Sequence, residues 1–184
     1  MNIGIDIDDT IVNTYDTFVK LVCMKYGLDY PELISKKMEY NDLCDKLKNY
    51  NEYTKDLFSI LVKSVELKEN VVEVFKKLQE DGHKIILITA RNYEEYDDPY
   101  NQTYEYLTKN NIPFDKIIVN IEKKDKVCLD EQIDLFIDDS TKHCRDVSQV
   151  GINTLQFNAL FNENVKEFPK VYSWNQVYNI IKCL

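Results

Sequence analysis

The feature that most constrains the fold of this chain is a short apolar run near its start that ends in carboxylates. The run GIDIDDT at residues 4–10 places Asp6 and Asp8 two positions apart and is closed by Thr10. Alternate side chains of a β-strand point to the same side, so a strand here puts both carboxylates together at its carboxyl end. Open α/β sheets carry their sites at that edge. Two carboxylates this close repel each other, so the arrangement requires a shared proton or a cation.

Two other interpretations of the same motif have to be weighed. Calcium loops of the EF-hand type also begin with Asp-x-Asp, but they need Gly at the sixth position and Glu at the twelfth. Counted from Asp6, those positions hold Ile11 and Thr17, so this interpretation fails. An acidic turn after a strand, with no chemical role, remains open on this motif alone.

Beyond residue 81, apolar runs alternate with helical segments. Short runs typical of strands buried on both faces are predicted at 84–89, 114–120, 133–138 and 152–157, with helices at 94–110, 124–131 and 141–150. Gly82 is expected to end a helix, Ser140 to cap the helix at 141–150, and Ser173 to cap a closing helix over 174–184. Strands alternating with helices predict an α/β fold, a Rossmann-like parallel sheet flanked by helices.

The stretch from residue 13 to 70 departs from this alternation. Helical spacing of apolar residues begins at Phe18 and is expected to end at Gly27, and residues 43–47 and 57–65 are also predicted to be helical. Polar joints are expected around Tyr30-Pro31 and at 49–51. The simplest account is a small, tyrosine-rich helical insertion over 13–70, with residues 1–12 and 71–184 forming the core domain.

Polar residues also follow two later strands of the predicted sheet. Thr89 ends the run at 84–89 and is followed by Ala90 and Arg91, and Asp138 and Asp139 end the run that begins at residue 133. A basic residue, Lys126, lies in the helix before that second strand. Each of these residues taken alone has an ordinary structural explanation as a cap, a turn or a solvated helix face. Together they predict one site at one edge of the sheet.

The ordered set of D-x-D-x-T, strand-Thr, Lys and strand-Asp-Asp resembles the haloacid dehalogenase superfamily of phosphotransferases. The insertion directly after the first motif resembles the helical cap of one branch of that superfamily. Within it, the segments GIDIDDTI, ITAR and IDLFIDDS are most similar to the 5'(3')-deoxyribonucleotidases and their bacterial relatives. The resemblance implies a magnesium-dependent phosphatase that acts on a small phosphate monoester, with a nucleoside monophosphate as the favoured substrate.

Roles for individual residues follow from this resemblance and from the chemistry of phosphate esters. Asp6 is expected to attack phosphorus and form an aspartyl-phosphate, while Asp8 exchanges protons with the leaving group and with water. Thr89 and Lys126 are expected to hold the equatorial oxygens. Expected Mg²⁺ ligands are Asp6, the main-chain carbonyl of Asp8, and one of Asp138 and Asp139. Expected substrate contacts are Thr10, Tyr15, Phe18, Ala90 and Arg91, with Tyr15 as the candidate for stacking on a base.

Composition limits the partners and the compartment. The net charge of −9 disfavours binding to polynucleotides, which requires clustered Lys and Arg. The five cysteines are odd in number and show no CxxC spacing, which indicates free thiols in a reducing compartment. No secretion signal and no apolar stretch near the roughly 18 residues of a membrane span are evident. We therefore expect a cytoplasmic protein with a small phosphorylated metabolite as its partner; the oligomeric state is left open.

Two alternatives remain at this stage. One is a sugar-phosphate phosphatase or mutase on the same scaffold. The other is a binding domain that keeps the fold without turnover, which the intact set of acidic, Thr and Lys residues argues against.

Overall fold

The structure, a computed structural model, describes residues 1–37, 43, 47 and 50–184. The described strands form one sheet in the order β3-β2-β1-β4-β5-β6, and every neighbouring pair is parallel. They are β1 (Asn2–Ile5), β2 (Lys84–Ile88), β3 (Lys116–Ile118), β4 (Leu135–Asp138), β5 (Asn153–Phe157) and β6 (Lys170–Val171). The predicted α/β fold with a parallel sheet is confirmed. The short strand β6 was not predicted, because two residues carry no periodic pattern.

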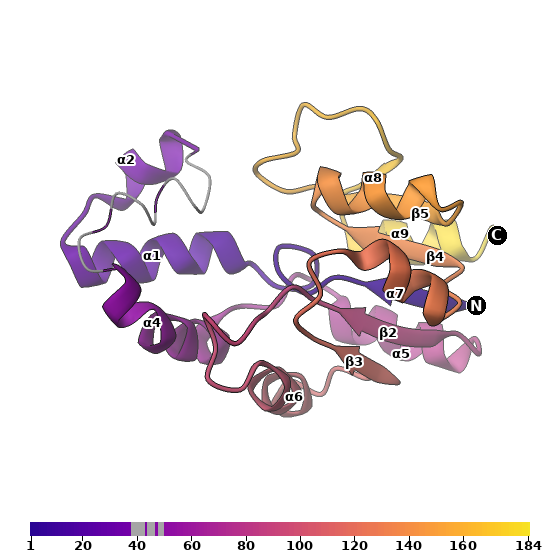
Figure 1. Ribbon diagram of the computed structural model, residues 1–184. Coiled ribbons are helices and arrows are strands. Elements are labelled where there is room, and N and C mark those ends of the chain that lie inside the picture. The colour runs from indigo at the N-terminus through magenta and orange to yellow at the C-terminus, as the bar shows by residue number, and fades with distance from the viewer. Residues whose placement is uncertain (38–42, 44–46, 48–49) are drawn as a thin grey trace.

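Helices cover both faces of the sheet (Figure 1). One hydrophobic cluster joins alternate strand residues such as Ile85 and Leu87 to α5 (Val71–Glu80), α6 (Pro99–Lys109) and α9 (Trp174–Ile181). A second cluster joins Ile86 and Ile88 to α7 (Lys124–Asp130) and α8 (Thr141–Gln149). The strands are therefore buried on both faces, which explains why they read as continuous apolar runs in the sequence.

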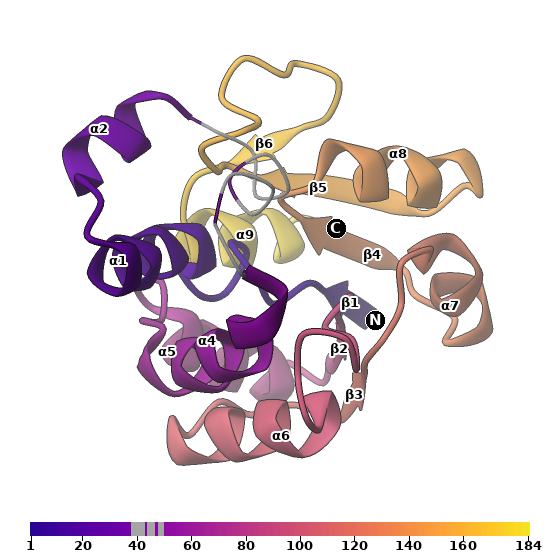
Figure 2. The ribbon, with the colours of Figure 1, turned by 60° about the vertical axis from the view of Figure 1, so that its left-hand side comes forward.

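Three further helices lie beyond the carboxyl ends of the strands, on the left of Figure 1 and again in Figure 2. They are α1 (Thr14–Tyr26), α2 (Tyr30–Ser35) and α4 (Tyr50–Ser64). Helix α1 ends at Gly27, whose φ of 68° lies in the left-handed region that glycine adopts without strain. Apolar residues of α1 and α4 belong to the same hydrophobic cluster as β1 and α5. This continuity means that the helices after β1 pack onto the sheet-bearing part of the chain.

Several predicted boundaries hold and others shift for local reasons. Ser140 and Ser173 cap α8 and α9, as expected, by accepting hydrogen bonds from the first turn. The helix predicted from residue 94 begins only at Pro99, because Asp98 caps it. Tyr30-Pro31 is not a joint but the first turn of α2, where proline is well tolerated. The helix predicted over 43–47 falls on a stretch of which the structure describes only residues 43 and 47.

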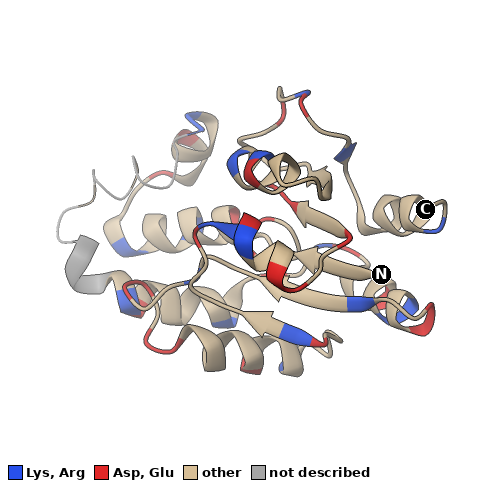
Figure 3. Ribbon diagram, turned by 45° about the vertical axis from the view of Figure 1, so that its right-hand side comes forward, with Lys and Arg blue, Asp and Glu red and all other residues tan. Residues whose placement is uncertain are grey.

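Charged residues of both signs are spread over several helices and loops (Figure 3). None of the described helices combines the length and the apolar character that crossing a membrane requires. Cys23, Cys128, Cys144 and Cys183 are free thiols in the described part of the chain.

Candidate active site

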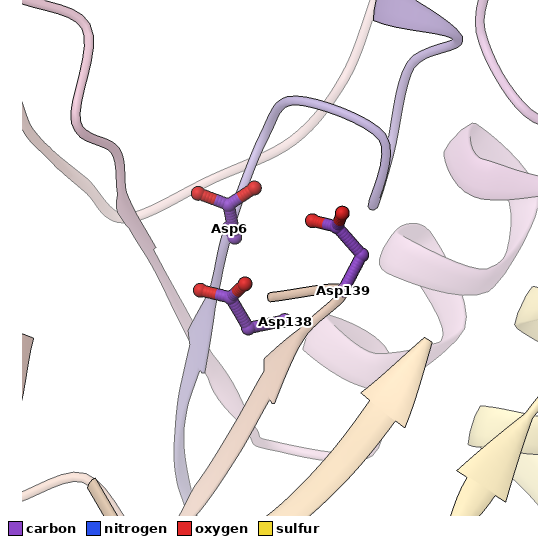
Figure 4. A group of neighbouring side chains, drawn as sticks. All are labelled: Asp6, Asp138 and Asp139. Atoms are coloured by element: carbon purple, nitrogen blue, oxygen red, sulfur yellow. The ribbon is translucent and has the colours of Figure 1, made fainter. Parts of the chain in front are cut away.

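Three carboxyl groups meet at the carboxyl ends of β1 and β4. Ile5 pairs with Ile137 in the sheet, and the amide of Asp6 donates to the carbonyl of Ile137 at 2.9 Å. This register brings the carboxyl group of Asp6 beside those of Asp138 and Asp139, with an oxygen of each within 4.8 Å of the others (Figure 4). Asp6 and Asp138 are buried, at 6% and 0% exposed. The sheet thus concentrates negative charge where little water screens it.

The lysine that faces this group is Lys124, not Lys126. The ammonium of Lys124 is fully buried and donates to Asp6 and, at 2.8 Å, to Oδ2 of Asp138. Lys126 is exposed on α7. Successive helix residues rotate by about 100°, so two positions carry the side chain to the opposite side. The predicted lysine, Lys126, therefore lies away from the carboxyl groups that Lys124 contacts. The sequence signal for Lys124 is that it opens the helix and so lies nearest the strand ends.

Asp138 and Asp139 have different surroundings. Both oxygens of Asp138 accept hydrogen bonds from the protein: Oδ1 from the amide of Ser140 at 2.7 Å, and Oδ2 from Lys124. Nδ1 of His143 lies 3.1 Å from the same Oδ2. The carboxylate of Asp139 accepts from Thr10 alone among the described residues, at 3.3 Å.

The pKa values of the three carboxyl groups follow from these contacts. Burial and the neighbouring carboxylates, Asp138 first among them, raise the pKa of Asp139 well above its usual value. Burial opposes ionisation of Asp138 too, but Lys124 and His143 outweigh it and lower its pKa. Burial raises the pKa of Asp6 to about 7, although Lys124 pulls in the opposite direction. The single ammonium of Lys124 therefore does not offset the burial and the mutual repulsion that raise the pKa values of Asp6 and Asp139.

Asp8 lies among donors of its own. Nε and Nη2 of Arg91 donate to the two oxygens of Asp8 at 2.9 and 2.8 Å, the bidentate geometry of a strong ion pair. The hydroxyls of Thr14 and Thr89 also donate to Asp8, at 2.6 and 3.5 Å. Burial would raise the pKa of Asp8, but Arg91 and these hydrogen bonds hold it below its usual value. The structure thus keeps Asp8 ionised.

A family model described as 5' nucleotidase, deoxy (pyrimidine), cytosolic type C protein (NT5C) matches residues 1–184. The chain belongs to this family. A comparison with curated proteins found no match.

Solved structures of haloacid dehalogenase-type hydrolases share the fold. A hydrolase of this family from Deinococcus radiodurans R1, with bound phosphate and sodium, has a TM-score of 0.71 at 10% identity, over 98% of this chain and 94% of that chain. A haloacid dehalogenase-like hydrolase from Streptococcus pneumoniae has a TM-score of 0.69 at 12% identity, over 98% and 97%. At such identities the likeness shows the fold. The family match makes this chain a phosphoric monoester hydrolase, and its fold is the one that these haloacid dehalogenase-type hydrolases have.

Some predicted substrate contacts of this NT5C-family chain have other partners in the structure. Arg91, 4% exposed, pairs with Asp8 and donates to Thr103 on α6 at 3.1 Å, so its guanidinium is engaged within the protein. Thr10 is fully buried and bonds to Asp139. Phe18, 1% exposed, packs on Phe58 with ring centroids 6.0 Å apart. These three side chains support the site or the core and are not open to a ligand in this conformation.

Tyr15 and Ala90 are the other two predicted substrate contacts, and Tyr15 too is buried, at 7% exposed. Tyr15 lies in the first turn of α1 and meets the edge of Phe161 with centroids 4.7 Å apart. Ala90, directly after Thr89, is only partly buried. The amide of Tyr15 donates to the carboxylate of Asp9 at 3.1 Å, so the motif itself fixes where α1 begins. This contact of Asp9 was not predicted, because Asp9 lies well before the N-cap position of α1, which is Asn13.

Proposed function

We propose that this protein is a magnesium-dependent nucleotidase that hydrolyses a nucleoside monophosphate through an aspartyl-phosphate on Asp6. The observation that carries the proposal is the buried group of Asp6, Asp138 and Asp139, in which three carboxyl groups face one lysine. A phosphate monoester is itself an anion, so a site rich in carboxylates has to take up a cation with it.

The donors at this edge of the sheet suit magnesium. Mg²⁺ prefers oxygen ligands and commonly takes one or two carboxylates from the protein, with phosphate and water completing its shell. We assign Asp6 and Asp139 as its carboxylate ligands and the main-chain carbonyl of Asp8 as a third. Asp139 is preferred to Asp138 because its carboxylate accepts only from Thr10 among the described residues, whereas both oxygens of Asp138 are engaged. When bound, the ion would neutralise charge on the phosphate.

The chain's own residues would carry the covalent steps. An oxygen of Asp6 forms a bond to phosphorus while the ester bond breaks and its electron pair leaves on the ester oxygen, which takes a proton from Asp8. Water then attacks the aspartyl-phosphate, gives its proton to Asp8, and frees Asp6 and phosphate. Lys124 takes the role predicted for Lys126, because its ammonium already donates to Asp6. Thr89 and the main chain at Ala90 would bind phosphate oxygens.

Arg91 is proposed to favour the ionised form of Asp8 over the protonated form. The bidentate pair stabilises the carboxylate, which is the form that accepts a proton from water. Donation to the leaving group requires protonated Asp8 and weakens that pair. Arg91 is therefore proposed to act on Asp8 and not on the substrate.

The substrate assignment rests on the family and on the aromatic residues at the start of α1. A base stacked on an aromatic ring gains about 1–3 kcal/mol, a gain that a sugar phosphate cannot obtain. Tyr15, next to Phe161, is the candidate platform. The residues of 13–70 are proposed to form a cap domain over the core of 1–12 and 71–184. Free thiols at the described cysteines are compatible with a cytoplasmic location, which remains a proposal.

Release of inorganic phosphate from a panel of monoesters tests the proposal. With magnesium present, we expect nucleoside monophosphates to be hydrolysed faster than hexose or triose phosphates, and chelation by EDTA to abolish turnover. The Tyr15→Ala variant should raise KM for nucleotides about 5- to 100-fold and leave KM for small aryl phosphates nearly unchanged. Tyr172→Ala, at an exposed tyrosine remote in sequence from the four motifs, is the control.

Three outcomes would contradict parts of this assignment. Faster hydrolysis of hexose or triose phosphates than of every nucleotide would favour the sugar-phosphate phosphatase or mutase. Full activity in EDTA would refute the proposed requirement for magnesium. A Tyr15→Ala variant with a lower Tm and an unchanged nucleotide preference would make Tyr15 a packing residue.

A further inference from the structure

The main chain of Asp139 is held by side chains from three separate segments. Asp139 follows the last residue of β4, so its backbone has left the hydrogen-bonding ladder of the sheet. Its amide donates to Oγ1 of Thr10 at 3.1 Å. Its carbonyl oxygen accepts from Nε2 of Gln156 at 3.1 Å and from Nδ2 of Asn162 at 2.7 Å. The backbone N–H and C=O of Asp139 thus both form hydrogen bonds, but with side chains and not with a neighbouring strand.

Asn162 lies in the turn between β5 and β6 and is 2% exposed. Its Nδ2 also donates to the carbonyl of Phe157 at 2.7 Å, and its Oδ1 accepts from the amide of Ala159 at 3.1 Å. The ammonium of Lys170 donates to the carbonyl of Asn162. The amide group therefore joins the turn to Asp139 with every one of its polar atoms in use.

Gln156 reaches the same carbonyl from the sheet. It is fully buried in β5, directly opposite Asp138 in the register, and its Nε2 donates to Oγ1 of Thr141 at 2.8 Å as well. Its Oε1 is buried with no hydrogen-bond partner among the described residues. A buried amide with an unpaired oxygen is costly, and an apolar side chain would fill a strand position without that cost. The hydrogen bond from Gln156 to the carbonyl of Asp139 explains why a glutamine, and not an apolar residue, occupies this buried strand position.

We propose that Gln156 and Asn162 are positioning residues that fix the Asp139 carboxylate for binding of a divalent cation. By holding the carbonyl oxygen of Asp139 from two directions, they restrict the backbone from which its carboxylate projects toward Asp6. Groups that orient a metal ligand in this way commonly affect metal affinity 10- to 100-fold. The inference rests on the proposed magnesium site and adds residues that lie outside the four sequence motifs.

Binding of magnesium to the full chain without substrate tests this inference. Gln156→Met and Asn162→Leu replace each amide with an apolar group of similar size. We expect the double variant to bind Mg²⁺ about 10-fold or more weakly, measured by calorimetric titration with MgCl₂ and by the MgCl₂ concentration that half-saturates the rise in Tm. Each single variant should show a smaller loss, because one donor still holds the carbonyl.

Two control variants separate positioning from stability. Asn164→Leu makes a similar change at an exposed asparagine on the same turn and should bind Mg²⁺ as the wild type does. Lys170→Met loosens the turn at the carbonyl of Asn162 without removing either donor to Asp139, so it should lower Tm more than it lowers affinity. If the double variant does not fold, the single variant Gln156→Met tests the inference, and we expect it to bind Mg²⁺ several-fold more weakly than the wild type.

The possible results are distinguishable. Variants with a lower Tm but wild-type affinity for Mg²⁺ would overturn the positioning role and leave the proposed function standing. A wild-type protein that binds no Mg²⁺ in either measurement would overturn the proposed magnesium site, and this inference with it.

Discussion

Two groups of charged side chains lie at the same edge of the sheet, and they differ in how far positive charge compensates their carboxylates. The carboxylate cluster consists of Asp6, Asp138 and Asp139, and Lys124 is the lysine that donates to it among the described residues. The Asp8 group consists of Asp8 with Arg91, Thr14 and Thr89. The first group places three carboxyl groups around the one ammonium of Lys124, with the imidazole of His143 beside Asp138. The second places one carboxylate among one guanidinium and two hydroxyls.

This difference shows what each group is suited to do. Burial and mutual repulsion raise the pKa of Asp139 well above its usual value and that of Asp6 to about 7, so the carboxylate cluster has a deficit of positive charge. A divalent cation would remove the deficit. In the Asp8 group, Arg91 overcomes the burial that would otherwise raise the pKa, and Asp8 stays ionised. The carboxylate cluster keeps an uncompensated tendency toward negative charge, whereas the charge of Asp8 is matched by Arg91.

The largest expected effect comes from removing the nucleophile of the carboxylate cluster. Asp6→Asn is nearly isosteric, so we expect the fold to persist and steady-state turnover to fall about 10⁴-fold or more. Because the change also removes a repelling charge, Tm in the absence of metal should not fall. Asp130→Asn, on the exposed side of α7, is the matched control. Multiple turnovers by Asp6→Asn, free of wild-type contamination, would refute the covalent mechanism.

The Asp8 group should respond according to the leaving group. Asp8→Asn removes the proton donor, which matters for an alkoxide and little for a nitrophenolate that leaves without a proton. In the first turnover, we expect release of nucleoside to slow about 10²- to 10⁴-fold and release of p-nitrophenol by far less. Equal losses on both substrates would mean that Asp8 only positions its neighbours.

Lys124 and Lys126 form a pair that tests the correction made by the structure. Lys124→Met leaves buried carboxylates unpaired, which typically costs about 3–5 kcal/mol of stability. We expect a lower Tm and a strong loss of phosphate release. Lys126→Met changes an exposed side chain and should stay within about 0.5 kcal/mol of wild type in chemical denaturation. A reversal of this order would restore Lys126 as the site lysine.

The smallest effect concerns pH and metal removal. A carboxyl group whose folded pKa is raised binds its proton more tightly when folded, so stability increases as pH falls through that pKa. With a pKa of about 7, Asp6 alone should stabilise the metal-free protein by about 1 kcal/mol between pH 8 and pH 6. We expect Tm in EDTA to rise over this range, and saturating Mg²⁺ or Asp6→Asn to flatten the rise. A flat profile in EDTA would mean that the carboxylate cluster has no charge deficit.

Much of the core could be predicted from the sequence because its signals are local. The apolar runs predicted most of the strands, and their order with the helices predicted a parallel sheet. GIDIDDT and IDDS lie at strand ends, so the meeting of Asp6 with Asp138 and Asp139 followed from the common edge of parallel strands. The helix caps Ser140 and Ser173 could be predicted because capping depends on neighbours only a few residues away.

Only the tertiary structure decided which of several similar residues contact one another. Three lysines at 123–126 are equivalent in the sequence, and the start of α7 at Lys124 selects one of them. Arg91 was expected to contact the substrate and instead pairs with Asp8, because the chain after β2 brings its guanidinium back over the first motif. Gln156 and Asn162 follow no motif; they reach Asp139 because β5 lies beside β4 and the next turn folds over its end. Contacts between residues distant in sequence depend on packing, which no local pattern encodes.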